Sequence, residues 1–89
     1  PILLHRPAMR LRCEHIRAGR ALAHMKQQDL AERSGVSLPT IRRIEGKNGP
    51  ITAKHETVEA LVTVLEEAGV EFTNGDQPGV RLSVNRHHS

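Results

Sequence analysis

The segment 30–46, LAERSGVSLPTIRRIEG, constrains the fold most, because it sets a glycine between two short helical patterns. Leu30 and Ala31 supply the inner face of a helix expected over residues 27–33. A residue with positive φ is inexpensive only for glycine, so we expect this helix to end at Gly35. Gly35 is therefore interpreted as a turn between two helices and not as a flaw in one long helix.

A separate helix is predicted over residues 38–45, and its start carries its own signal. Ser37 precedes the pattern, and its hydroxyl is expected to accept a hydrogen bond from the free amide of Thr40. Pro39 falls in the first turn, where its missing N–H removes no helical hydrogen bond. Two short helices joined by a tight glycine turn are therefore predicted.

The outer side of the 38–45 helix is basic. Ile41 and Ile44 are three residues apart and are expected to face the core, which leaves Arg42 and Arg43 toward solvent. Arginine can pair with guanine through two parallel N–H donors, and it also binds phosphate. This is the plan of a helix-turn-helix, whose second helix fits the DNA major groove of about 12 Å.

Longer patterns flank this unit. Helices are expected over residues 14–23 and 56–68. The second carries an apolar stripe with helical spacing, formed by Val58, Leu61, Val62, Leu65 and Ala68. Residues 70–72 and 80–82 alternate apolar and polar side chains around a turn-rich loop, which predicts two short strands. A strand pair alone is marginal in water, so it should pack on the helices or on a second copy of the chain.

These patterns divide the chain into four parts. Residues 1–9 form an N-terminal extension, 10–69 the helix-turn-helix domain, 70–84 the strand pair and candidate dimerisation element, and 85–89 a tail. Residues 10–54 hold ten Lys/Arg against four acids, whereas residues 55–89 hold two against six. The asymmetry indicates a polyanion-binding face in the first half, with a mixed solvated surface as the alternative.

Composition argues against several other classes. Phe72 is the only aromatic residue, so no platform exists for stacking single-stranded bases. No apolar run approaches the ~20 residues that a membrane span needs, so no membrane partner is expected. Cys13 is the only cysteine, which excludes an internal disulfide and predicts a cytoplasmic location. The six histidines make no spaced pair with it that resembles a zinc site, and Glu66 and Glu67 lack catalytic partners. We expect no metal, no cofactor and no enzymatic site.

Residues 16–50, IRAGRALAHMKQQDLAERSGVSLPTIRRIEGKNGP, resemble the lambdoid phage repressor/Cro-type helix-turn-helix, the Xre family. The family's hallmark positions fit without a gap; they are Gln27, Leu30, Ala31, Gly35, Val36, Ser37, Thr40, Ile41, Ile44 and Glu45. The resemblance implies a mainly α, lambda-repressor-like bundle of four to five helices with a short C-terminal β-strand pair. It also implies a transcriptional regulator that binds double-stranded DNA sequence-specifically as a homodimer. We expect a repressor, although the residues themselves do not distinguish blocking from assisting polymerase.

The resemblance also implies site residues. Base edges would be read by Leu38, Pro39 and Arg43. The DNA backbone would be contacted by Gln27, Ser37, Thr40, Arg42, Lys47 and Asn48. A buried ion pair would join Arg20 and Glu45. Because Leu38 and Pro39 offer no hydrogen bonds, hydrogen-bonded readout would depend mainly on Arg43.

The chain departs from the family pattern near the start of the second helix. Lys26 stands where a capping Ser, Thr or Asn is usual, and His24 replaces a frequent glycine. Arg6, Arg10 and Arg12 form a candidate arm along DNA or a mere remnant upstream of the domain. Two functional alternatives stay open. One is an antitoxin-like DNA-binding protein whose acidic C-terminal half binds a toxin, and the other is a protein-interaction module that has lost DNA binding.

Overall fold

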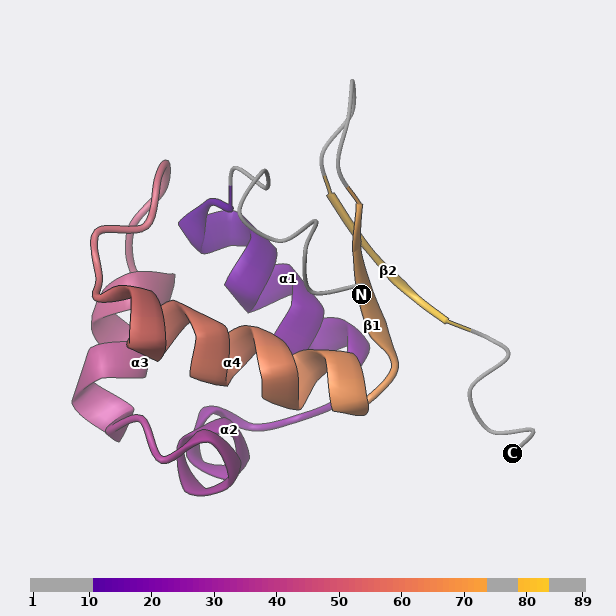
Figure 1. The fold of residues 1–89 in the computed structure, drawn as a ribbon, viewed down its shortest axis with the longest axis horizontal. Helices are drawn as coiled ribbons and strands as arrows, with labels where there is room; N and C mark the ends of the chain where they lie inside the picture. Colours follow the sequence, from indigo (N-terminus) through magenta and orange to yellow (C-terminus); the bar gives the residue numbers. More distant parts are fainter. Residues whose placement is uncertain (1–10, 74–78, 84–89) are drawn as a thin grey trace.

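The computed structural model describes residues 11–73 and 79–83. In chain order these form α1 (Cys13–Leu22), α2 (Gln27–Ser34), α3 (Leu38–Glu45), α4 (His55–Glu67), β1 (Val70–Thr73) and β2 (Gly79–Leu82). Figure 1 shows α3 at one end of the molecule and the strand pair at the other, with α1 and α4 between them. The predicted mainly helical bundle with a C-terminal strand pair is confirmed. The extension over 1–9 and the tail over 85–89 lie outside the described residues.

One apolar core joins all four helices to the strands. Its fully buried side chains are Ile16, Leu30, Ile41, Leu61, Leu65, Val62 and Val70. The stripe expected on α4 lies largely in this core, with Val58 and Ala68 half-buried at its edges. Val64 is also buried, although the predicted stripe did not include it.

The turn between α2 and α3 follows the sequence prediction. Gly35 has a left-handed φ of 78°, and its amide donates to the carbonyl of Ala31. The Ser37 hydroxyl accepts from the Thr40 amide at 3.3 Å, as expected of the cap. Both features lie inside the turn, so α3 begins at Leu38 as the sequence predicts. It ends at Glu45, which also agrees with the predicted range.

The turn between α1 and α2 contains the two residues that depart from the family pattern, His24 and Lys26. His24 adopts a positive φ of 54°, a conformation that favours glycine. Lys26 precedes α2 without a side-chain cap hydrogen bond, as expected. Instead, the Asp29 carboxylate accepts from the Lys26 amide at 3.1 Å, so an acid in the first turn satisfies a backbone donor.

The two strands are antiparallel and pack on the helices. Val70 pairs with Leu82 and Phe72 with Val80, and the buried Val70 and Phe72 side chains face α1 and α4. β1 comes close to α1 at Gly19, where an added Cβ would lie 3.3 Å from Val70 Cγ1. Packing on the helices, one of the two expected alternatives, is therefore observed.

Candidate nucleic-acid interface

The helix α3 has one apolar side and one basic side. Ile41 and Ile44 are 0% and 2% exposed, whereas Arg42 and Arg43 are both exposed. The Arg43 guanidinium extends toward the following loop, where Nη1 lies 3.5 Å from the Thr52 carbonyl oxygen. Neither arginine lies beneath another part of the described chain, so both can reach a ligand outside the protein.

The first turn of α3 is more enclosed. Pro39 is exposed, while Leu38 and Thr40 are half-buried. The exposed Ser37 hydroxyl donates to Thr40 Oγ1 at 2.8 Å while it accepts the Thr40 amide. The two hydroxyls named as backbone contacts are thus partnered with each other in the free protein.

A buried ion pair fixes the C-terminal end of α3. Arg20 Nε donates to Glu45 Oε2 and Arg20 Nη2 donates to Glu45 Oε1, both at 2.8 Å. The Glu45 side chain is 3% exposed, and hydrogen bonding to it raises the pKa of Arg20. Arg20 Nη1 also donates to the Met25 carbonyl at 2.9 Å. The structure therefore brings Arg20 and Glu45 together and ties α1 to the end of α3.

Gln27 joins the same cluster from α2. Its Nε2 donates to Glu45 Oε1 at 3.0 Å, and the side chain is half-buried. An amide nitrogen has two hydrogens, so one N–H remains for another acceptor. Gln27 lies in the first turn of α2, where backbone N–H groups lack helical partners and favour anions. Its geometry suits both bracing α3 and meeting a phosphate.

Arg17 is a site residue that the sequence analysis missed. Its Nη1 donates to the carbonyl of Glu45 and lies 3.4 Å from the carbonyl of Lys47. Its Nη2 donates to Asn48 Oδ1 at 3.3 Å. Lys47 and Asn48, both expected to touch phosphates, are exposed and lie on a loop that Arg17 holds.

Glu14 holds the far end of that loop. Its Oε1 accepts from the Gly49 amide at 2.9 Å, and this bond is the main reason that the pKa of Glu14 falls to about 2. The Cys13 amide donates to the Gly49 carbonyl at 2.8 Å. Glu14, Arg17 and Arg20 repeat every three residues on one side of α1. That spacing was the available signal, because a helix side that reaches Glu45 should also reach the residues after it.

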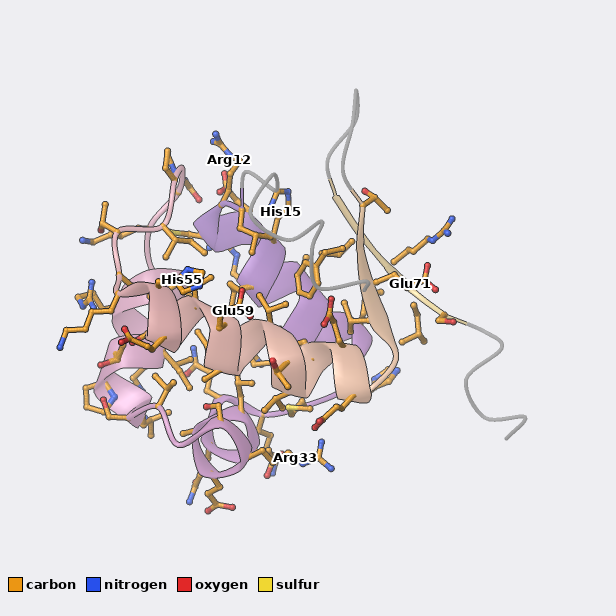
Figure 2. All side chains as sticks on the ribbon, viewed as in Figure 1. Arg12, His15, Arg33, His55, Glu59 and Glu71 are labelled. Carbon is orange, nitrogen blue, oxygen red and sulfur yellow. The ribbon has the colours of Figure 1, made fainter. Side chains whose placement is uncertain are left out.

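The candidate arm is wrong at Arg12. The Arg12 amide donates to His15 Nδ1 at 3.0 Å, and the two residues lie together at the start of α1 in Figure 2. Arg12 also forms a β-bridge with Pro50. The Arg12 backbone is fixed because Arg12 is the residue that caps the start of α1. Burial lowers the pKa of His15, which suits a neutral ring that accepts at Nδ1. Arg6 and Arg10 lie outside the described residues.

Within residues 11–73 and 79–83, no group of three or more His, Cys, Asp or Glu side chains could hold a metal ion. No helix in that part of the chain is long and apolar enough to cross a bilayer. Cys13 is buried at 2% exposure, with Sγ 3.9 Å from the Pro50 carbonyl oxygen.

Comparison with known proteins points to the same region. A family model described as helix-turn-helix matches residues 16–68, more than half of the chain. The match begins inside α1 and ends directly after α4, so it leaves out the strand pair. No curated protein matches the chain.

Proposed function

The chain belongs to the Cro/C1-type helix-turn-helix family, also called XRE, whose members are DNA-binding transcription regulators, and we propose that it is a repressor that binds specific duplex sites as a homodimer. One observation carries this proposal: α3 buries Ile41 and Ile44 while it exposes Arg42 and Arg43. A helix of this kind can enter a major groove and still remain anchored to the core. Cytoplasmic location follows from this function and stays a prediction.

The proposal assigns base contacts and backbone contacts to different residues of the interface. Arg43 reads a guanine edge, and Leu38 and Pro39 contact bases, with thymine methyl groups as their suitable partners. The DNA backbone is contacted by Gln27, Ser37, Thr40, Arg42, Lys47 and Asn48. Because the Ser37 hydroxyl donates to Thr40 Oγ1, it must turn to donate to a phosphate, whereas the Thr40 hydroxyl can donate while it still accepts from Ser37.

The test begins with selection of bound sites from random duplex DNA. On the preferred site, Arg43→Ala should weaken binding by ~1–3 kcal/mol and relax the preference at one base pair. Arg42→Ala is the matched control, because it removes a neighbouring exposed arginine and should weaken all duplexes alike. Wild-type affinity should fall steeply with salt. Equal losses on every duplex for both variants would refute base reading by Arg43, and absent or salt-insensitive binding would refute DNA binding altogether.

The strand pair supports the dimer. Leu82, on the edge strand β2, is 43% exposed and is the large apolar side chain most open to water among the described residues. A two-fold dimer through this strand would have to place the two α3 helices ~34 Å apart to meet successive major grooves. Removing residues 70–89 would not test this cleanly, because Val70 and Phe72 belong to the core.

Sedimentation of Leu82→Lys gives the cleaner test. Lysine should abolish the dimer, because a charged group would be buried at the interface, while the fold stays intact. Thr63→Lys, at an exposed position of α4, is the control. A dimer that persists in Leu82→Lys would place the interface elsewhere.

The acidic surface of α4 favours a second candidate function, that of an antitoxin-like protein. Glu56, Glu59, Glu66 and Glu67 lie on this one helix, so a basic partner such as a toxin could bind there in an antitoxin-like arrangement. Co-expression with a basic protein encoded beside this chain tests the candidate. A stoichiometric complex lost in Glu56→Lys/Glu59→Lys would support it, and failure to co-purify would refute it.

A further inference from the structure

We infer that Arg17 is a positioning residue for the contact between the loop 46–49 and the DNA backbone. The inference rests on the proposed function, because it concerns the same site. The loop carries Lys47 and Asn48, whose side chains are exposed, and it follows α3 directly. Arg17 itself lies on α1, 30 residues earlier in the chain than Lys47. It acts on DNA through the loop that it holds.

One guanidinium contacts three consecutive parts of this segment. Arg17 bonds to the Glu45 carbonyl at the end of α3, approaches the Lys47 carbonyl, and bonds to the Asn48 side chain. The Glu45 carbonyl is in the last turn of α3, where carbonyls lack helical partners and favour a cation. Only a planar, forked donor group can serve acceptors spread in this way, and a lysine ammonium cannot reproduce its geometry.

The contact with Asn48 sets the chemistry of the exposed side. Arginine has only donors, so the amide of Asn48 must turn its oxygen toward Arg17. The NH₂ group of Asn48 is then directed away from Arg17 as a donor. Phosphate oxygens only accept hydrogen bonds, so this orientation fits a DNA backbone and the opposite orientation would not.

The far end of the loop is held as well. Glu14 Oε1 accepts from the Gly49 amide, and the Cys13 amide donates to the Gly49 carbonyl. α1 thus fixes both ends of a four-residue loop in the free protein. The conformational entropy of ordering this loop is lost on folding and need not be lost on binding, which is preorganisation for the ligand.

A double-mutant cycle on the preferred duplex tests the inference. Arg17→Lys keeps the positive charge, so a merely electrostatic role would leave the affinity unchanged. Positioning by the fork predicts about a tenfold loss, the same as the loss in Asn48→Ala, which removes one charge-assisted hydrogen bond. Because both changes disable one contact, the double variant should also lose about tenfold, whereas independent effects would multiply to about a hundredfold. Unchanged affinity in Arg17→Lys, or multiplied losses in the double variant, would overturn the inference.

Two controls separate this result from other failures. Arg33→Lys is the matched control, because Arg33 is exposed on α2 and makes no contact with the loop (Figure 2); its affinity should equal wild type. Hydrogen exchange in the free protein supplies a readout without DNA: Gly49 amide protection should fall in Arg17→Lys while α3 protection stays. Protection lost across α3 would show a general loss of structure and would refute positioning. If the wild type binds the duplex but the cycle gives a contrary result, only the inference is refuted. If the wild type binds no duplex, the proposed function is refuted as well.

Discussion

α1 holds two regions of the molecule by different kinds of contact. On one side, Glu14, Arg17 and Arg20 bind the end of α3 and its loop through hydrogen bonds and an ion pair. On another side, Gly19 lets β1 and α4 approach closely, because an added Cβ would lie 3.3 Å from Val70 of β1 and 3.4 Å from Leu65 of α4. The α3 end of the molecule is thus joined to α1 by polar contacts in addition to the buried Ile41 and Ile44, whereas Gly19 joins the strand end by apolar packing alone.

Polar and apolar contacts fix different properties of the two regions. Hydrogen bonds weaken steeply when their angles change, so the polar contacts fix the direction of α3 and the loop. Apolar packing is not directional, so the position of the strand pair depends mainly on the volume between the strands and the helices α1 and α4. The region proposed to meet DNA is the one whose orientation is specified by directional bonds. The effects of substitutions in that region should depend on pH and on which hydrogen-bond partners remain. The effects of substitutions at the strand end should depend on the size of the new side chain.

Glu45→Ala should have the largest effect. It removes the buried carboxylate that accepts from Arg20 and Gln27, and it leaves the Arg20 cation without its partner. The free energy of unfolding should fall by ~3–5 kcal/mol, measured by urea denaturation. Glu32→Ala, an exposed acid on α2, should change it little. Similar costs for the two variants would mean that the polar contacts do not hold α3 in place.

Gly19→Val should be the next largest change and should act at the strand end. A valine would push against Val70, whose Cγ1 already lies 3.3 Å from an ideal Cβ. Overpacking of this kind costs ~1–3 kcal/mol, visible as a lower melting temperature. Ala18→Val, at the exposed neighbouring position of α1, gives the cost of a valine on this helix without overpacking, and helix propensity alone would favour Gly19→Val. Equal costs at both positions would contradict the close approach of β1 to α1.

What the sequence could predict is mostly local. Gly35 and Ser37 reveal the α2–α3 turn because the φ preference and the cap act within a few residues. The side of α3 that faces solvent follows from the spacing of Ile41 and Ile44. The positions of Arg20 and Glu45 came from the family resemblance, which supplied a long-range contact that no local pattern contains.

The contacts that escaped prediction join residues far apart in the chain. Arg17 and Asn48 are separated by 31 residues, and Glu14 and Gly49 by 35. Their meeting depends on how α1 lies across the end of α3, which helix periodicity alone does not determine. The three-residue spacing becomes informative only once the resemblance has placed Arg20 against Glu45. Gly19 gave no signal either, because its role appears only where β1 approaches it. The candidate interface was therefore predicted at α3 itself, and the contacts that hold its loop were missed.

His24→Gly should raise stability by a smaller amount, about 1 kcal/mol. His24 has a φ of 54° in the turn between α1 and α2, where glycine has no Cβ clash, although its unfolded chain has more freedom to lose. His24→Ala keeps the Cβ and should show no gain. The gain is a backbone effect, so thermal melts should give it equally at low and high salt. A gain in both variants, or none in either, would show that the turn is not strained by its side chain.

The pH dependence of Glu14 should be the smallest effect, because its side chain is 36% exposed and screened by water. The hydrogen bond from Gly49 lowers the folded-state pKa from 4.5 to about 2. A lowered pKa means that the stabilisation is complete above the unfolded-state value and is lost as pH falls from 4.5 toward 2. Glu14→Gln lacks this titration, so the difference in unfolding free energy between wild type and variant should shrink over that range. The Glu14 charge also raises the pKa of His15, so the comparison is repeated in a His15→Gln background, which removes that titration. A difference that stays constant down to pH 2 would mean that the loop is held without Glu14, and that its bonds to Arg17 and Cys13 suffice.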